Sequence, residues 1–263
     1  MSLTEQTRSE ILRVDSVSKT FGAVRALHDV SLSVSEGECR GIIGANGAGK
    51  STLFRIIARH MSSDSGHVSY RGKSLAHSPA HSLAGMGLAI VFQEALPFQD
   101  MTVQENIMVG GHSTLRHGFL AAMLKTPSRR VEENEIRTRS WEIIDRLGLS
   151  DIANEHAQEL PFGMQRLVQI GRALCGRPRL LLLDEPASGL RFQERNALAE
   201  VLKKLISEGL TVMLVEHDVR FVFSLAESIT VLDLGEVIAQ GTPQAIRENQ
   251  QVIEAYLGTA ANA

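Results

Sequence analysis

The sequence predicts an α/β fold, in which helices pack on a parallel sheet and a helical segment is inserted into the chain. Three observations predict it. Short apolar runs, typical of buried strands, alternate with stretches in which apolar residues recur at helical spacing. The short apolar run Glu38–Gly44 is followed by a glycine-rich turn and a helical pattern, the usual opening of a parallel α/β unit. Residues 94–160 contain helical patterns and no convincing strand.

The individual elements follow from periodicity and from the turn residues between them. The predicted strands are Ile11–Val17, Val30–Val34, Glu38–Gly44, His67–Arg71, Leu88–Phe92, Leu180–Asp184, Thr211–Val215, Ile229–Leu232 and Val237–Ala239. The predicted helices are Lys50–Arg59, Val103–Val109, Arg130–Leu147, Gln193–Leu205, Val219–Leu225, Pro243–Glu248 and Gln251–Leu257. The apolar stripe of the charged helix 130–147 is predicted to consist of Ile136, Trp141, Ile143, Ile144 and Leu147.

These elements are expected to form a single domain over residues 1–263. Its α/β core is expected to comprise residues 10–93 and 166–242, and the inserted helical subdomain residues 94–165. A short helical tail, residues 243–263, completes the chain.

Composition narrows the function. The chain has 263 residues, of which 43% are hydrophobic, too many for a disordered protein. Its formal net charge of −3 gives no indication of binding to nucleic acid or to an anionic membrane surface. Cys39 and Cys175 are far apart and favour two plain thiols in a reducing compartment. No run is long and apolar enough to cross a bilayer, and no secretory signal is present, so we expect a membrane role only through a partner chain.

The turn after Glu38–Gly44 matches the phosphate-loop pattern in full, as Gly44-Ala45-Asn46-Gly47-Ala48-Gly49-Lys50-Ser51. Glycines allow successive backbone N–H groups to turn inward around phosphates. The following helix directs its positive end at them, and Lys50 adds a full charge. Ser51 offers a hydroxyl to Mg²⁺. The pattern predicts a nucleoside triphosphate site without indicating a family.

A second motif, Leu180-Leu181-Leu182-Leu183-Asp184-Glu185, is a buried-strand run that ends in two acids. Asp184 is placed to hold Mg²⁺, directly or through water. Glu185 is the candidate to orient and deprotonate an attacking water. Taken alone, the motif is also compatible with a strand that ends in solvated acids. A glutamate directly after the aspartate that is expected to bind Mg²⁺ argues against a phosphate-loop kinase or a small GTPase, because those enzymes usually position the nucleophile differently.

Together with further motifs, these two make the sequence resemble the ABC ATPase family across essentially the whole chain. Leu160-Pro161-Phe162-Gly163-Met164-Gln165 looks like its signature motif. Gln93 is similar to its Q-loop glutamine, Ser188-Gly189-Leu190 to its D-loop and His217 to its switch histidine. Phe21 matches its adenine-stacking aromatic. The resemblance implies a RecA-like parallel core with an antiparallel β subdomain and an inserted α-helical subdomain.

The resemblance also implies a head-to-tail dimer, in which ATP lies between one phosphate loop and the signature helix of the other subunit. The implied catalytic residues are Glu185, His217 and Gln93, and Ser51, Gln93 and Asp184 are the implied Mg²⁺ ligands. The implied nucleotide contacts are Phe21, Val24, Gly44, Asn46, Gly47, Ala48, Gly49, Lys50, Ser51, Thr52, Pro161, Phe162, Gly163, Met164 and Gln165.

Simpler interpretations of single residues stay open. Phe21 is compatible with an ordinary core position, His217 with a strand-end histidine and Gln93 with a polar surface residue. A metal role for His77 and His81 is disfavoured, since Pro79 interrupts any helix across them. The run 129–139 alternates in charge and is expected to form a solvated helix face.

Several details resemble the ATPases of branched-chain or hydrophobic amino acid importers. These are Pro161 followed by an aromatic, the segment from His117-Gly118-Phe119-Leu120 to Thr126-Pro127, and the ending Val252–Gly258. The resemblance implies permease subunits and a periplasmic or extracellular substrate-binding protein as partners, and a place at the cytoplasmic face of the inner membrane. The cargo itself cannot be chosen, because the ATPase does not touch it.

Two residues depart from the pattern of the ABC ATPase family. Arg191 and Phe192 stand where the family usually has Asp or Asn, then often Pro. We hypothesise that this reversed charge makes the D-loop asymmetric and favours pairing with a different ATPase subunit. The competing functions are a soluble ABC protein of DNA repair or translation, a stand-alone phosphate-loop kinase or GTPase, and an exporter ATPase. The single cassette argues against a soluble protein of DNA repair or translation. An exporter ATPase shares all of this chemistry and differs only in its partner chains and in the direction of transport.

Overall fold

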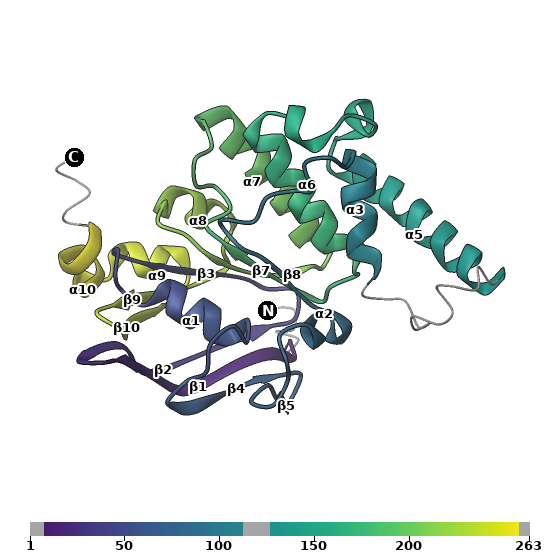
Figure 1. Cartoon of the computed structure of the whole chain (residues 1–263). Helices are drawn as coiled ribbons and strands as arrows, with labels where there is room; N and C mark the ends of the chain where they lie inside the picture. Colours follow the sequence, from purple (N-terminus) through teal and green to yellow (C-terminus); the bar gives the residue numbers. More distant parts are fainter. Residues whose placement is uncertain (1–7, 113–126, 258–263) are drawn as a thin grey trace, which may run out of the picture.

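The computed structural model describes residues 8–112 and 127–257, and these form two β-sheets with helices on either side of the larger one (Figure 1). The larger sheet has the strand order β10 (Glu236–Gly241), β9 (Ser228–Asp233), β3 (Cys39–Gly44), β8 (Thr211–Val215), β7 (Leu180–Asp184) and β6 (Leu88–Val91). Its strands pair in parallel except β10, which pairs antiparallel with β9 at the edge. The parallel sheet predicted from the sequence is therefore confirmed.

Strand β7 contains the run of four leucines, residues 180–183, because both of its faces are buried. Leu181 and Leu183 pack into the core on one face of the sheet, and Leu180 and Leu182 pack into the core on the other. Successive side chains of a strand point to opposite faces, so a strand that is covered on both sides has no position left for a polar residue.

The smaller sheet is antiparallel and has the strand order β2 (Val24–Ser35), β1 (Glu10–Phe21), β4 (Ser65–Tyr70) and β5 (Lys73–Ser74). Helix α1 (Lys50–Ile57) lies between this sheet and the larger one (Figure 1). Its apolar side chains are buried, and they share one core with β1, β2 and the lower face of the larger sheet. The phosphate-loop helix is thereby held by packing from both sides.

The opposite face of the larger sheet is covered by helices. They are α3 (Val103–Gly111), α5 (Pro127–Arg146), α6 (Phe162–Cys175), α7 (Phe192–Ser207) and α8 (Val219–Leu225). Two 3₁₀ turns, Ser150–Ile152 and Ala157–Glu159, connect α5 to α6. Helices α3, α5 and α6 pack against one another, as expected for a helical insertion (Figure 1).

Helix α5 shows two departures from the predicted pattern. Ile136, Ile143, Ile144 and Leu147 are buried, but Trp141 is 41% exposed. At about 100° per residue, Trp141 lies about 140° around the helix from Ile136 and so faces away from the core. The expected solvated face also has an exception, because Arg139 is buried and donates a hydrogen bond to the Cys175 carbonyl oxygen at 2.8 Å.

Other differences concern short or exposed segments. Strand β2 begins at Val24 rather than Val30, because its exposed first residues give no alternation signal. Helix α2 (Ser82–Met86) and β5 were not predicted and are too short to show a period. The tail contains α9 (Pro243–Glu248), α10 (Gln250–Val252) and a π-helical turn, Ile253–Leu257.

The segment from His117 to Thr126, taken in the sequence as a subfamily insertion, lies outside the described residues. Both cysteines are buried. Across residues 8–112 and 127–257, we find no helix with the length and hydropathy that a bilayer crossing requires.

Candidate functional site

The candidate site lies where three neighbouring strands of the larger sheet end. Strand β8 pairs in parallel with both β3 and β7, so the chain leaves all three at the same edge. This edge carries the phosphate loop after β3, Glu185 directly after β7, and His217 two residues after β8. Ligands of open α/β sheets bind at the carboxyl ends of the strands, where loops and helix N-termini meet.

Two glycines of the phosphate loop are required by their surroundings. A Cβ atom on Gly44 would lie 2.2 Å from the Leu232 carbonyl oxygen. Gly49 has φ +99°, and a Cβ atom there would lie 2.5 Å from the Ala26 carbonyl oxygen. Because no side chain fits at either position, the loop can follow the backbone of its neighbours closely.

Lys50 is the first residue of α1 and is only 5% exposed. Its Nζ donates to the carbonyl oxygens of Gly44 at 2.7 Å and Ala45 at 2.9 Å. Burial lowers the pKa of Lys50, while the nearby carboxylates of Glu185 and Asp184 act in the opposite direction. The ammonium group therefore lies inside the loop that the sequence assigned to phosphate.

A pocket of about 330 Å³ opens over this loop. Its walls combine the phosphate loop, the start of β2, the acid after β7 and the β9–β10 turn, namely Val24, Arg25, Ala26, Asn46, Gly47, Ala48, Gly49, Lys50, Ser51, Thr52, Glu185 and Leu234. Of the predicted nucleotide contacts, Gly44 forms the base of the loop beneath this pocket, and Phe21 does not line it. Phe21 ends β1 and is 46% exposed, which rules out an ordinary core position.

Sequence reasoning missed Arg25, Ala26 and Leu234 in this pocket. Leu234 is 83% exposed, yet its turn is fixed to the phosphate loop, because the Gly235 N–H donates to the Ala48 carbonyl oxygen at 3.2 Å. The sequence does hold one indication of this role. Leu234 is a large apolar residue in a turn, directly before Gly235, where a polar residue is usual.

The two acids after β7 have different environments. Asp184 is 8% exposed, and burial, helped by the charge of Glu185, raises the pKa of Asp184 to about 6. Glu185 has φ +44°, a left-handed conformation that is costly for a glutamate, and its N–H donates to the Val215 carbonyl oxygen at 2.9 Å. Its Oε2 lies 3.4 Å from Nδ1 of His217. Glu185 and His217 are therefore brought together.

The residues present fit a magnesium ion. Asp184 Oδ1 is buried and has no hydrogen-bond partner within the described part of the chain, so this oxygen is open to coordinate a cation. Ser51 follows Lys50 at the start of α1 and adds a hydroxyl oxygen. No group of three His, Cys, Asp or Glu side chains among the described residues could hold a metal by itself. Mg²⁺ suits such a place, since it is usually bound by one or two protein groups together with phosphate oxygens.

Gln93 follows β6 and is exposed, and it is not among the residues that line the pocket. Its Nε2 lies 3.4 Å from the Ser188 hydroxyl, which belongs to the predicted D-loop. Behind it, the buried guanidinium of Arg166 donates to the carbonyl oxygens of Phe92 at 3.4 Å and Gln93 at 3.2 Å. The segment around Gln93 is thereby attached to helix α6.

The predicted signature segment, residues 161–165, forms the start of α6 and does not line the nucleotide pocket of its own chain. Phe162 is 42% and Met164 40% exposed. The Gly163 N–H points to Glu194 Oε1 at 3.4 Å. The structure of one chain therefore leaves this helix start on the surface, away from the phosphate loop.

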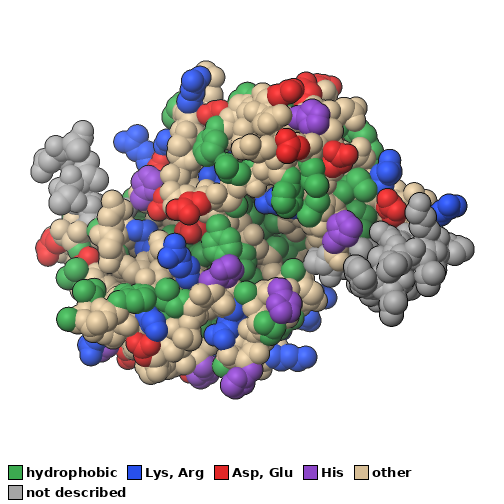
Figure 2. All heavy atoms as spheres, viewed as in Figure 1, with side chains coloured by type: hydrophobic (Ala, Val, Ile, Leu, Met, Phe, Trp, Pro, Cys, Tyr) green, Lys and Arg blue, Asp and Glu red, His purple; other side chains and the backbone are tan. Residues whose placement is uncertain are grey.

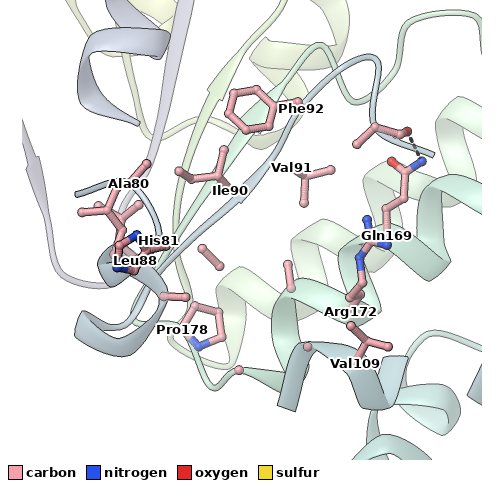
Figure 3. Close-up of a pocket in the computed structure, with 17 residues that line it drawn as sticks. Ala80, His81, Leu88, Ile90, Val91, Phe92, Val109, Gln169, Arg172 and Pro178 are labelled. Carbon is pink, nitrogen blue, oxygen red and sulfur yellow. Dashed lines mark hydrogen bonds between the residues drawn. The ribbon is translucent and has the colours of Figure 1, made fainter. Parts of the chain in front are cut away.

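A second hollow, of about 390 Å³, lies between α2 and β6 on one side and α3 and α6 on the other. Figure 2 shows hydrophobic side chains along the middle of this face. Figure 3 shows His81 and Leu88 at α2, Ile90 and Phe92 farther along the strand, and Gln169, Arg172 and Val109 across from them. Gln169 donates to the Ala95 carbonyl oxygen.

Arg172 is the cation of this groove. Its guanidinium lies 5.1 Å from the centre of the Phe98 ring, and burial lowers the pKa of Arg172. No carboxylate in residues 8–112 and 127–257 forms an ion pair with it. The groove is therefore apolar apart from His81, Gln169 and one arginine that has no anionic partner within the described chain.

Comparisons with known proteins agree with this geometry. The family profile described as "ABC transporter" matches residues 27–188, and the profile "Branched-chain amino acid ATP-binding cassette transporter" matches residues 236–262. The chain is 38% identical to the high-affinity branched-chain amino acid transport ATP-binding protein BraF of Pseudomonas aeruginosa, over 95% of this chain and 98% of that protein. It is 37% identical to LivG of Escherichia coli K12, described in the same words, over the same shares.

Solved structures give the same result. An ATP-binding cassette of an ABC transporter in its ADP conformation superimposes with a TM-score of 0.82 and 31% identity, covering 95% of this chain and 99% of that one. A dimeric bacterial ABC transporter cassette superimposes with a TM-score of 0.73 and 27% identity, covering 89% of this chain and 99% of the other.

The raised pKa of Asp184 generates a stability prediction. An unfolded aspartate titrates near 3.9, so the stability that the proton provides is fully present below about pH 4 and is lost as the pH rises through about 6. Asp184→Asn removes this loss. Without nucleotide or Mg²⁺, we expect this variant to be more stable than the unchanged chain at pH 7.5 by on the order of 2–3 kcal/mol, and equally stable near pH 4.

Urea unfolding at both pH values measures the difference. Asp151→Asn, at an exposed aspartate, is the control and should show no such change. A stability difference for Asp184→Asn that is the same at both pH values would contradict the prediction.

Proposed function

The chain belongs to the ATP-binding cassette family of ABC transporters, and on this premise we propose that it binds and hydrolyses ATP to power an importer of branched-chain or related amino acids. One observation carries the proposal: the phosphate loop, two acids and a histidine stand at one edge of a parallel sheet. The similarity to BraF and LivG and the profile match over residues 236–262 support the class of cargo.

In the proposed reaction the phosphate loop and Lys50 bind the β- and γ-phosphates. Asp184, Ser51 and Gln93 are the proposed Mg²⁺ ligands, and Mg²⁺ when bound would neutralise phosphate charge. Glu185 accepts a proton from the attacking water, and His217, 3.4 Å from Glu185, hydrogen-bonds the γ-phosphate. Phe21 and Val24, both exposed beside the pocket, contact the base and ribose.

We further propose that the surface start of α6, residues 161–165, closes over the ATP of a second cassette in a head-to-tail dimer. Helix N-termini bind anions through their first N–H groups, and the Gly163 N–H would exchange Glu194 Oε1, 3.4 Å away, for a phosphate oxygen. The exposure of Phe162 and Met164 and the similarity to a dimeric cassette support this arrangement. Permease subunits anchor the pair at the cytoplasmic face of the membrane, and a substrate-binding protein delivers cargo on the other side.

Glu185→Gln tests the catalytic assignment. We expect the variant to bind Mg-ATP about as tightly as the unchanged protein but to hydrolyse it about 10²–10⁴-fold more slowly, since the general base is lost. In the assembled transporter it should trap the closed pair of cassettes. ATP turnover and equilibrium nucleotide binding give the two readouts.

Lys50→Ala is the matched comparison, because it removes a phosphate contact rather than the base and should weaken binding itself. Full hydrolysis by Glu185→Gln would show that another group activates the water.

The apolar groove between α2 and α6 is the proposed docking site for a short permease helix. It lies beside Phe92, next to Gln93, so a helix seated there touches the segment that follows the nucleotide site. Its apolar walls provide the burial that holds a partner helix. The solitary cation Arg172 suits a partner that brings an acidic side chain or the carbonyl end of a helix.

Ala84→Trp tests this docking site. Ala84 is exposed on α2 and lines the groove, so a tryptophan there fills the groove without disturbing a core. We expect unchanged ATP binding and at least a tenfold loss of the chain that co-purifies with the permease from detergent-solubilised membranes. Ala197→Trp, at an exposed alanine of α7 away from the groove, is the control. Wild-type recovery with Ala84→Trp would place the permease elsewhere.

Arg191 is the basis for proposing that the second cassette is a different chain. It is exposed at the start of α7, next to Phe192, which is 73% exposed. In a dimer of identical chains, two such arginines would each face the basic phosphate loop of the other, at a cost in like-charge repulsion.

We therefore expect the Glu185→Gln chain alone to remain monomeric with Mg-ATP, and Glu185→Gln/Arg191→Asn to form a self-dimer at least ten times more readily. Native mass spectrometry across a range of concentrations measures both. Tight self-dimerisation of Glu185→Gln without the second change would show that Arg191 does not select the partner.

A further inference from the structure

A buried carboxylate that the proposed reaction does not use lies between the catalytic loops. Glu216 links the end of β8 to His217, and its side chain is fully buried. A buried carboxylate is costly unless its oxygens accept hydrogen bonds, so its partners indicate what the residue does.

The hydrogen bonds that the Glu216 carboxylate accepts join two loops. Oε1 accepts a hydrogen bond from the N–H of Ala187 at 2.7 Å, in the loop that follows Glu185. Oε2 accepts one from the N–H of His217 at 3.1 Å, and the N–H of Asp218 bonds the same carboxylate. One side chain thus connects the loop after β7 to the loop after β8.

The catalytic pair lies between these connections. Glu185 is fixed on one side by its own N–H, which donates to the Val215 carbonyl oxygen at 2.9 Å, and on the other by the bond from Ala187, two residues later. Nδ1 of His217 is 3.4 Å from Oε2 of Glu185 and 3.6 Å from Oε2 of Glu216. One imidazole nitrogen therefore lies close to both carboxylates.

We propose that Glu216 is a positioning residue for hydrolysis, which holds the Glu185 and His217 loops at the separation that the reaction needs. This inference rests on the proposed function. Glu185 carries a left-handed backbone, a strained conformation that persists only when the surroundings enforce it. Burial raises the pKa of Glu216, and the three N–H groups oppose that rise by favouring the charged form.

Glu216→Gln is the discriminating variant. It keeps the size of the side chain, but its NH₂ cannot accept a hydrogen bond, so one of the two loops is released. In the assembled ATPase we expect kcat to fall about ten- to a hundredfold, as for a misplaced catalytic group, and KM for ATP to stay within about twofold. Glu227→Gln, which removes an exposed carboxylate paired with Arg8, should leave both unchanged. Unchanged kcat in Glu216→Gln would overturn the proposal.

A double-mutant cycle separates positioning from general structural damage. Because Glu216 acts through the pair that includes His217, the Glu216→Gln change should slow His217→Ala by less than it slows the unchanged chain. Losses that multiply would overturn the proposal. If Glu216→Gln does not fold, Glu216→Asp keeps both acceptor oxygens but withdraws them by one methylene. It should also lower kcat at constant KM, and wild-type kcat would again overturn the proposal.

These outcomes differ from failure of the proposed function itself. Full activity of Glu185→Gln would refute the catalytic assignment, whatever Glu216→Gln does. Slow hydrolysis by Glu185→Gln together with normal kcat in Glu216→Gln would refute the positioning role alone.

Discussion

The spacing of β3, β8 and β7 is the constraint on which the rest of the site depends. Neighbouring strands of a sheet lie about 4.8 Å apart, and parallel neighbours end at the same edge. Lys50, Glu185 and His217 each follow one of these strands within a few residues. Their proximity therefore needs no long loop, and it is fixed by the same backbone hydrogen bonds that hold the sheet together. Covering both faces of that sheet, with α1 below and the helices above, keeps this edge rigid.

Burial then determines the electrostatics of the edge. Lys50 and Asp184 are both almost inaccessible, and burial disfavours the charged form of each, so the pKa of Lys50 is lowered and that of Asp184 is raised. Asp184 Oδ1 has no partner among the described residues, while Lys50 is bonded only to backbone carbonyls. In the proposed function, a metal-bound triphosphate would satisfy these groups. Their perturbation marks the functional site independently of the motifs.

The sequence was sufficient where chemistry is encoded in neighbouring residues. The glycines and lysine of 44–51, and the leucines before Asp184, predict both a local structure and a chemical role, and the fold class inferred from them is confirmed. The family that the further motifs resemble is confirmed as well. It was insufficient where a role depends on the third dimension. Trp141 belongs to an apolar pattern in the sequence but turns away from the core by its angle around α5. Glu216 is ordinary in sequence, and Leu234 is marked only by its place before Gly235. The pairing of strands brings Leu234 to the pocket over the phosphate loop, and Glu216 between the loops after β7 and β8.

The bonds of Lys50 to the Gly44 and Ala45 carbonyls have a consequence for how a ligand is received. These two hydrogen bonds hold the loop in its curved shape in the chain without ligand. In the proposed function, a triphosphate would replace these carbonyl acceptors with phosphate oxygens around a loop that already has its shape, so little conformational entropy would be lost on binding.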